Sequence, residues 1–153
     1  ACLGALDAWL VIRGIKTLPL RMEQHQKNAF AIAKWLQEQP RVQYVLYPGL
    51  ENHHGYAINK AQTTGFGGMI SFAVDSAETA RQILEGVKLI KFAESLGGTE
   101  SLITYPIRQT HTDLTAEECA EKRITDCLLR FSTGIEATQD LIDDLAQAFA
   151  AVK

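Results

Sequence analysis

The sequence predicts an α+β domain in which a sheet of about four strands carries helices on one face. Apolar residues recur at helical spacing in several stretches, and short runs rich in β-branched and aromatic residues lie between them, bounded by Gly or Pro. The strands are short and unequally spaced, and no strand-to-helix turn carries G-x-G-x-x-G or a phosphate-loop pattern. A nucleotide-binding α/β fold therefore has no direct support.

Capping residues and apolar spacing predict the helices. Pro19 suits the first turn of a long helix because its φ is fixed and its missing N–H is not needed there. Asp75 with Glu78, and Thr115 with Glu118, have the spacing of a capping box. Helices are expected over residues 19–39, 56–62, after 75, over 115–123 and from 138 onward.

β-Branched and aromatic runs predict the strands. They are expected at residues 42–47, 69–74, 89–93, 102–105 and 126–133. In addition, residues 7–12 form a continuous apolar stretch, which Arg13-Gly14 is expected to interrupt.

Composition excludes several functional classes. The 153 residues suit one domain, and the formal net charge of −3 without a basic run argues against nucleic acid as a partner. No apolar run approaches the roughly 18 residues that span a membrane, and no basic leading region marks a signal peptide. The odd, scattered set of Cys2, Cys119 and Cys127 fits a reducing compartment. We therefore expect a cytoplasmic protein.

The stretch of residues 92–111 is the densest in chemically capable side chains. Glu94 and Ser95 stand just before Gly97-Gly98, where the backbone can approach a ligand closely. The stretch predicts the lining of a ligand site. The alternative interpretation is that Glu94 and Ser95 only cap a loop.

Arg130 is a second candidate, because it interrupts an apolar strand between Leu129 and Phe131. Alternation directs Arg130 to the face opposite the helices. An arginine there is costly unless it is paired or faces a cleft. Its planar fork suits a ligand carboxylate, but from spacing alone an internal ion pair or a solvated sheet face is the favoured interpretation.

Two motifs then resemble a known family. S-L-G-G-T-E-S-L-I at residues 95–103, followed by Thr110-His111, resembles the pyridoxal-phosphate (PLP) enzymes of trans-sulfuration, which include cystathionine γ-synthase, β-lyase and γ-lyase. L-L-R-F-S-T-G-I-E at 128–136 is similar to a second signature of that family. Residues 7–22 are similar to the segment that enters its small domain.

The resemblance implies the small C-terminal domain of a fold-type-I PLP enzyme, with a mainly antiparallel sheet. Residues 1–18 would link it to a large PLP-binding domain, and 19–153 would be the substrate-binding domain. It implies pyridoxal 5'-phosphate as cofactor, held by a lysine in an S-x-T-K-type motif that these residues lack. We expect this chain alone to be inactive, and the full-length enzyme to be a homotetramer.

The resemblance also assigns site residues on the substrate side only. It implies that Arg130 binds the α-carboxylate of an amino acid such as cystathionine, that Ser95 and the Leu96 backbone help to position it, and that Glu94 lies near the distal end of the substrate. No catalytic, cofactor-binding or metal-binding residue is expected here. Tyr105–His111 resembles cystathionine β-lyases, whereas Glu94 favours γ-synthase or γ-lyase. A stand-alone amino-acid-binding regulatory module is the alternative of another class.

Overall fold

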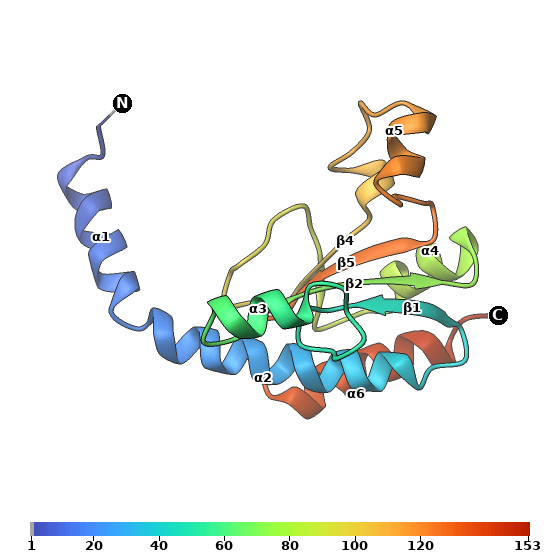
Figure 1. The fold of residues 1–153 in the computed structure, drawn as a ribbon, viewed down its shortest axis with the longest axis horizontal. Helices are drawn as coiled ribbons and strands as arrows, with labels where there is room; N and C mark the ends of the chain where they lie inside the picture. Colours follow the sequence, from blue (N-terminus) through green and yellow to red (C-terminus); the bar gives the residue numbers. More distant parts are fainter. Residues whose placement is uncertain (1) are drawn as a thin grey trace.

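A computed structural model describes residues 2–153 and shows an α+β domain built on a five-stranded sheet (Figure 1). The strand order is β1 (Val42–Leu46), β2 (Met69–Val74), β5 (Leu128–Ser132), β4 (Leu102–Thr104) and β3 (Lys91–Phe92). All neighbouring pairs are antiparallel except β3 and β4, which run parallel. The sheet has one strand more than the predicted number of about four, and its edge strand β3 lies within the stretch 89–93 where a strand was expected.

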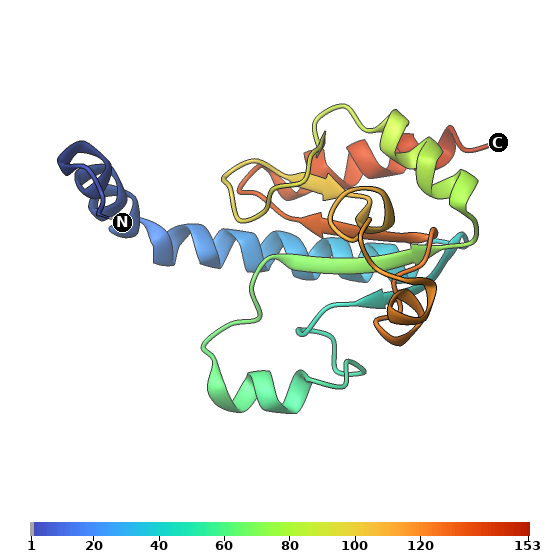
Figure 2. The same ribbon diagram turned by 90° about the horizontal axis from the view of Figure 1, so that it is seen from above.

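The helices α2 (Leu18–Gln37), α4 (Ala77–Gly86) and α6 (Thr138–Ala150) form a layer against one face of the sheet, as predicted (Figures 1 and 2). Alternating strand residues such as Phe72 and Phe131 point into this layer and are fully buried. Leu36, Ile83 and Leu145 meet them from the three helices. This is the main hydrophobic core.

One end of the opposite face of the sheet is covered by short helices. There the 3-10 helix η1 (Pro106–Arg108) and α5 (Ala116–Glu121) stand above the sheet (Figure 1). A small second core of Ala73, Ile124 and Leu128 packs beneath them. Arg130 lies on the same face of the sheet, in the middle of β5.

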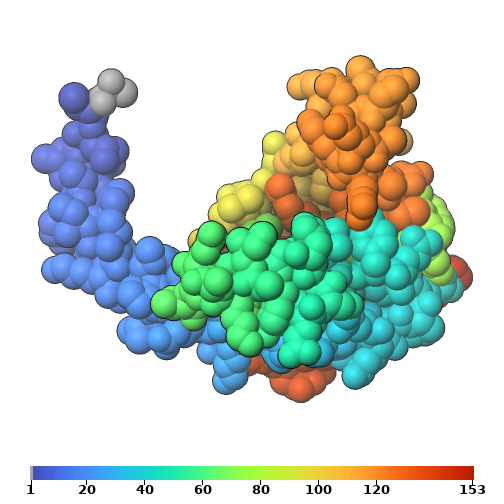
Figure 3. Space-filling view, viewed as in Figure 1, coloured from blue at the N-terminus to red at the C-terminus, as the bar shows by residue number. Residues whose placement is uncertain are grey.

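The first helix, α1 (Ala5–Ile15), extends away from the body of the molecule (Figures 1 and 3). Arg13 and Gly14 interrupt the apolar run of the sequence but not the helix, because α1 continues through both residues and turns into α2 only at Lys16-Thr17. Its apolar side chains, among them Trp9 and Ile12, are exposed. Within residues 2–153, no helix combines the length and the apolar character needed to cross a bilayer.

Helix caps follow the sequence in one case and depart from it in another. Thr115 and Glu118 form the predicted capping box at α5. At α4 the cap is Ser76, whose Oγ accepts the Thr79 N–H at 3.0 Å. Asp75, the predicted cap, instead pairs with Arg41 at 3.1 Å. The short helix α3 (Tyr56–Gln62) has the predicted bounds.

Candidate functional site

Arg130 occupies the middle of β5, on the face turned away from the three-helix layer. In the strand register it lies opposite Ser71 of β2 on one side and Thr104 of β4 on the other. Directly opposite residues of an antiparallel pair share a face, so the three side chains form one row across the sheet. Leu129 and Phe131, its chain neighbours, are fully buried in the core on the other face.

The Arg130 guanidinium has no partner among the described residues. The side chain is half-buried, and its Nε is buried without any hydrogen bond. Within residues 2–153 it forms no salt bridge, so the internal ion pair considered from the sequence is absent from the described part of the chain. A buried donor left unsatisfied costs roughly 1–3 kcal/mol, more when it is charged. The geometry therefore favours an anion that is not part of this chain.

The predicted residues Glu94, Ser95 and Leu96 form an exposed segment of the loop between β3 and β4. The segment is held at both ends. Thr104 Oγ1 donates to the Ala93 carbonyl at 2.8 Å, and the Gly97 N–H donates to Ser132 Oγ at 2.9 Å.

Both of these anchors lie on the face of Arg130. Thr104 is opposite Arg130 in the register, and Ser132 is two residues further along the same strand. Gly97 has a φ of +77°, which a side chain would strain, so the glycine is required at this point of the loop. The loop rises on the side of the sheet that carries α5 (Figure 1). The structure thus brings the two predicted clusters to one face.

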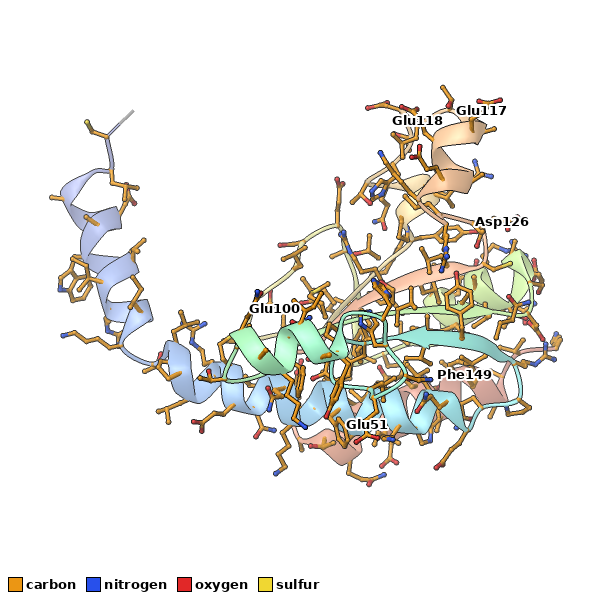
Figure 4. All side chains as sticks on the ribbon, in the orientation of Figure 1. Glu51, Glu100, Glu117, Glu118, Asp126 and Phe149 are labelled. Atoms are coloured by element: carbon orange, nitrogen blue, oxygen red, sulfur yellow. The ribbon has the colours of Figure 1, made fainter. Side chains whose placement is uncertain are left out.

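The far end of the same loop is fixed by residues that the sequence analysis missed. Glu136 accepts two hydrogen bonds from Ser101, one from its N–H at 2.6 Å and one from its Oγ at 2.8 Å. The Ile135 N–H donates to the Thr99 carbonyl at 2.9 Å. In Figure 4, Glu100 marks this end of the loop, well apart from Glu117 and Glu118 on α5.

Two buried polar residues of α2 support the turn after β5. His25 Nδ1 donates to the Thr133 carbonyl at 2.5 Å, and Asn28 Nδ2 donates to the Gly134 carbonyl at 2.9 Å. Both were overlooked, although a signal existed: they continue the apolar stripe of Ala29 and Ile32 toward the start of the helix at the same spacing. Polar residues on a buried stripe need internal partners.

Tyr105, interpreted from sequence as a strand end, links η1 to the start of β5. Its hydroxyl donates to the carbonyl of Asp126 at 2.6 Å. Asp126 lies just before β5 and is labelled in Figure 4. Burial, and secondarily the Asp126 carboxylate, raise the pKa of the Tyr105 phenol. The hydroxyl therefore stays a donor at neutral pH.

The residues of this chain do not fit covalent attachment of an aldehyde cofactor. All eight lysine side chains are exposed, whereas a lysine that forms a Schiff base is activated by desolvation or a neighbouring cation. Among residues 2–153, no group of three His, Cys, Asp or Glu side chains could hold a metal ion. What the described residues do offer is the guanidinium of Arg130, whose Nε is buried without a partner.

Comparison with known sequences decides the family. The profile of the Cys/Met metabolism PLP-dependent enzymes matches residues 1–150. The chain belongs to this family. The resemblance drawn from residues 95–103 and 128–136 is therefore confirmed.

Family members with different reactions are about equally similar to the chain. It is 50% identical to the cystathionine γ-lyase of Bacillus subtilis over 95% of its length, 50% identical to the cystathionine γ-synthase of Haemophilus influenzae over 100%, and 48% identical to a cystathionine β-lyase of Lactococcus lactis over 97%. It spans 37–39% of the length of these three relatives.

Solved structures of the family share the fold. The cystathionine γ-synthase of Xanthomonas oryzae, determined with aminoacrylate and cysteine, superposes with a TM-score of 0.90 at 44% identity, covering 95% of this chain and 38% of that one. This agreement confirms the fold-type-I small domain and its mainly antiparallel sheet.

Proposed function

We propose that this chain holds the α-carboxylate of the amino-acid substrate in a PLP-dependent enzyme that acts on C–S bonds. The buried Arg130 Nε without a partner is the observation that carries the proposal. A guanidinium presents parallel N–H donors that match a carboxylate. Ser95 and the Leu96 backbone, on the segment held between Ala93 and Gly97, are proposed to complete the carboxylate site.

The role of the chain is orientation. PLP, when bound in the whole enzyme, supplies the electron sink for the reaction. A carboxylate fixed at Arg130 leaves the substrate few orientations, which determines the bond presented for cleavage. We propose that residues 1–18 link to a PLP-binding domain that carries the lysine, and that the whole enzyme is a homotetramer.

Among the family reactions we propose cystathionine β-lyase, supported by the resemblance of Tyr105–His111 to β-lyases. A γ-lyase or γ-synthase is the second candidate, supported by Glu94, which is exposed one residue before Ser95 and which the family resemblance assigns to the distal end of the substrate. Identities of 48–50% to all three classes do not separate them.

Product analysis with the full-length enzyme and cystathionine tests the assignment. A β-lyase releases homocysteine, pyruvate and ammonia, whereas a γ-lyase releases cysteine, α-ketobutyrate and ammonia. A γ-synthase instead forms cystathionine from cysteine and an activated homoserine. The regulatory-module alternative predicts that the 153-residue chain binds a free amino acid without any cofactor, and that no full-length form turns cystathionine over.

A further inference from the structure

The clamp between Glu136 and Ser101 has a geometry suited to a role in the site. Both carboxylate oxygens of Glu136 accept from the same residue, the N–H and the Oγ of Ser101. Ser101 Oγ in turn accepts the Gly134 N–H at 2.8 Å. Ser101 is completely buried. Its donors are therefore both committed to Glu136, and its hydroxyl also ties the loop to the turn after β5.

The clamp requires an ionised carboxylate and a glycine. Because both Glu136 oxygens accept, a protonated acid or an amide would lose one of the two bonds. A Cβ at position 134 would stand 2.6 Å from the carbonyl carbon of Glu100, and closer still to the Thr99 oxygen. Only glycine lets the loop lie against this turn.

Asn28 holds the turn that carries Glu136. Its Nδ2 donates to the carbonyls of both Gly134 and Glu136 at 2.9 Å. Its Oδ1 accepts from Thr138 Oγ1 at 2.6 Å and from Gln24 Nε2 at 3.0 Å. Asn28 is fully buried. The backbone of Glu136 is thus fixed by α2, and the carboxylate is presented to Ser101 from a rigid base.

We propose that Glu136 is a positioning residue for substrate binding: through Ser101 it holds the loop of residues 93–101, and hence Ser95, over the face of Arg130. This inference rests on the proposed function, since it assumes that Ser95 and Arg130 share one carboxylate. The loop is then held at four points, at Ala93, Gly97, Thr99 and Ser101. Glu136 supplies the only charged partner among these four.

Removal of the carboxylate tests the clamp in the full-length holoenzyme. In Glu136→Ala the loop loses its charged anchor, and the KM for cystathionine rises about 10- to 100-fold, the scale of a lost charge-assisted hydrogen bond. The kcat falls less than the KM rises, since the reacting groups are untouched. Glu136→Gln keeps one acceptor and gives a smaller rise in KM.

A double-substitution cycle with Ser95→Ala separates positioning from general stability. If Glu136 acts by placing Ser95, the Glu136→Ala effect on KM shrinks in the Ser95→Ala background. Ser76→Ala is the matched control, because it removes the cap of α4, away from the site, and lowers the unfolding midpoint without changing KM. Hydrogen exchange of the amides of residues 94–101, which needs no activity, becomes faster in Glu136→Ala but not in Ser76→Ala.

The outcomes distinguish this inference from the function on which it rests. If Arg130→Ala raises KM but Glu136→Ala only lowers the unfolding midpoint and adds independently to Ser95→Ala, the positioning role is overturned and the carboxylate site stands. If Arg130→Ala leaves KM unchanged, the proposed function itself fails. Faster exchange of the loop amides together with a reduced effect in the Ser95→Ala background supports the inference.

Discussion

Thr104 lies directly opposite Arg130 in the pairing of β4 with β5, and its hydroxyl donates to the Ala93 carbonyl at 2.8 Å. The row of the sheet that carries the guanidinium therefore also carries an anchor of the loop with Glu94 and Ser95. Strand register brings these two clusters together, although they are about 35 residues apart in the sequence.

Thr104→Val tests this anchor. Valine keeps the shape and the β-branch but cannot donate to Ala93 O, so we expect a loss of about 0.5–1.5 kcal/mol, the usual net value of one hydrogen bond. Urea unfolding of the 153-residue chain measures it. In the full-length enzyme the KM for cystathionine should rise severalfold. An unchanged KM with the expected loss of stability would show that the anchor is structural only.

Gly134→Ala should be more damaging than any other glycine substitution near the site. Its new methyl group would overlap the backbone of Thr99 and Glu100, and overpacking of this kind costs about 1–3 kcal/mol. Gly14→Ala is the control: it lies inside α1 with nothing within 4 Å of the added Cβ, and should stabilise by about 0.5–1 kcal/mol. Equal unfolding midpoints for the two variants would contradict the close approach.

The N-cap of α4 is Ser76 in the structure, whereas the sequence pattern predicted Asp75. Ser76→Ala loses the bond to the Thr79 N–H and should cost about 1–2 kcal/mol. Asp75→Ala loses only a half-exposed ion pair with Arg41, which should contribute about 0.2–1 kcal/mol to stability. Thermal unfolding of both variants decides which residue is the cap. A larger loss of stability in Asp75→Ala than in Ser76→Ala would show that Asp75 is the cap, as predicted from the sequence.

Sequence patterns predicted the features that are determined by residues close together in the chain. β2 and α3 were predicted with the correct bounds because their ends are marked by local turn residues, and Arg130 was found because it breaks an apolar alternation. β3 proved shorter than expected because its pairing with β4 covers only two residues.

Contacts distant in sequence could not be predicted in this way. Glu136 resembles any charged surface residue until Ser101, 35 positions earlier, is seen beside it. The role of Asn28 is likewise visible only from its hydrogen bonds to the carbonyls of Gly134 and Glu136, more than 100 positions away. The polar support of the site is therefore a property of the tertiary structure.

Ionisation of Tyr47 is expected to lower the stability of the folded chain at alkaline pH. Burial raises the pKa of its phenol to about 12, and its hydroxyl donates to the Gly67 carbonyl at 3.0 Å. Because the folded pKa exceeds the unfolded value near 10, this contribution is complete below pH 10 and is lost between pH 10 and 12, at about 1.4 kcal/mol per pH unit.

Tyr47→Phe isolates that effect. Below pH 10 the variant should be less stable by about 0.5–1.5 kcal/mol, because it lacks the hydrogen bond to Gly67. Between pH 10 and 12 the parent loses stability faster, so the two unfolding curves should cross about one unit above pH 10. Parallel curves from pH 8 to 12 would mean that the tyrosine ionises as easily in the folded chain as in the unfolded one.

The KM of Arg130→Ala in the full-length enzyme tests the carboxylate site most directly. Loss of a charge-assisted contact worth about 1.5–3 kcal/mol should raise the KM for cystathionine by roughly 10- to 150-fold. The visible absorption of bound PLP should be unchanged, because Arg130 touches only the substrate in this account. Arg130→Lys, which keeps the charge but not the planar fork, should give an intermediate KM. A KM within twofold of the parent enzyme, with the cofactor fully bound, would contradict the account.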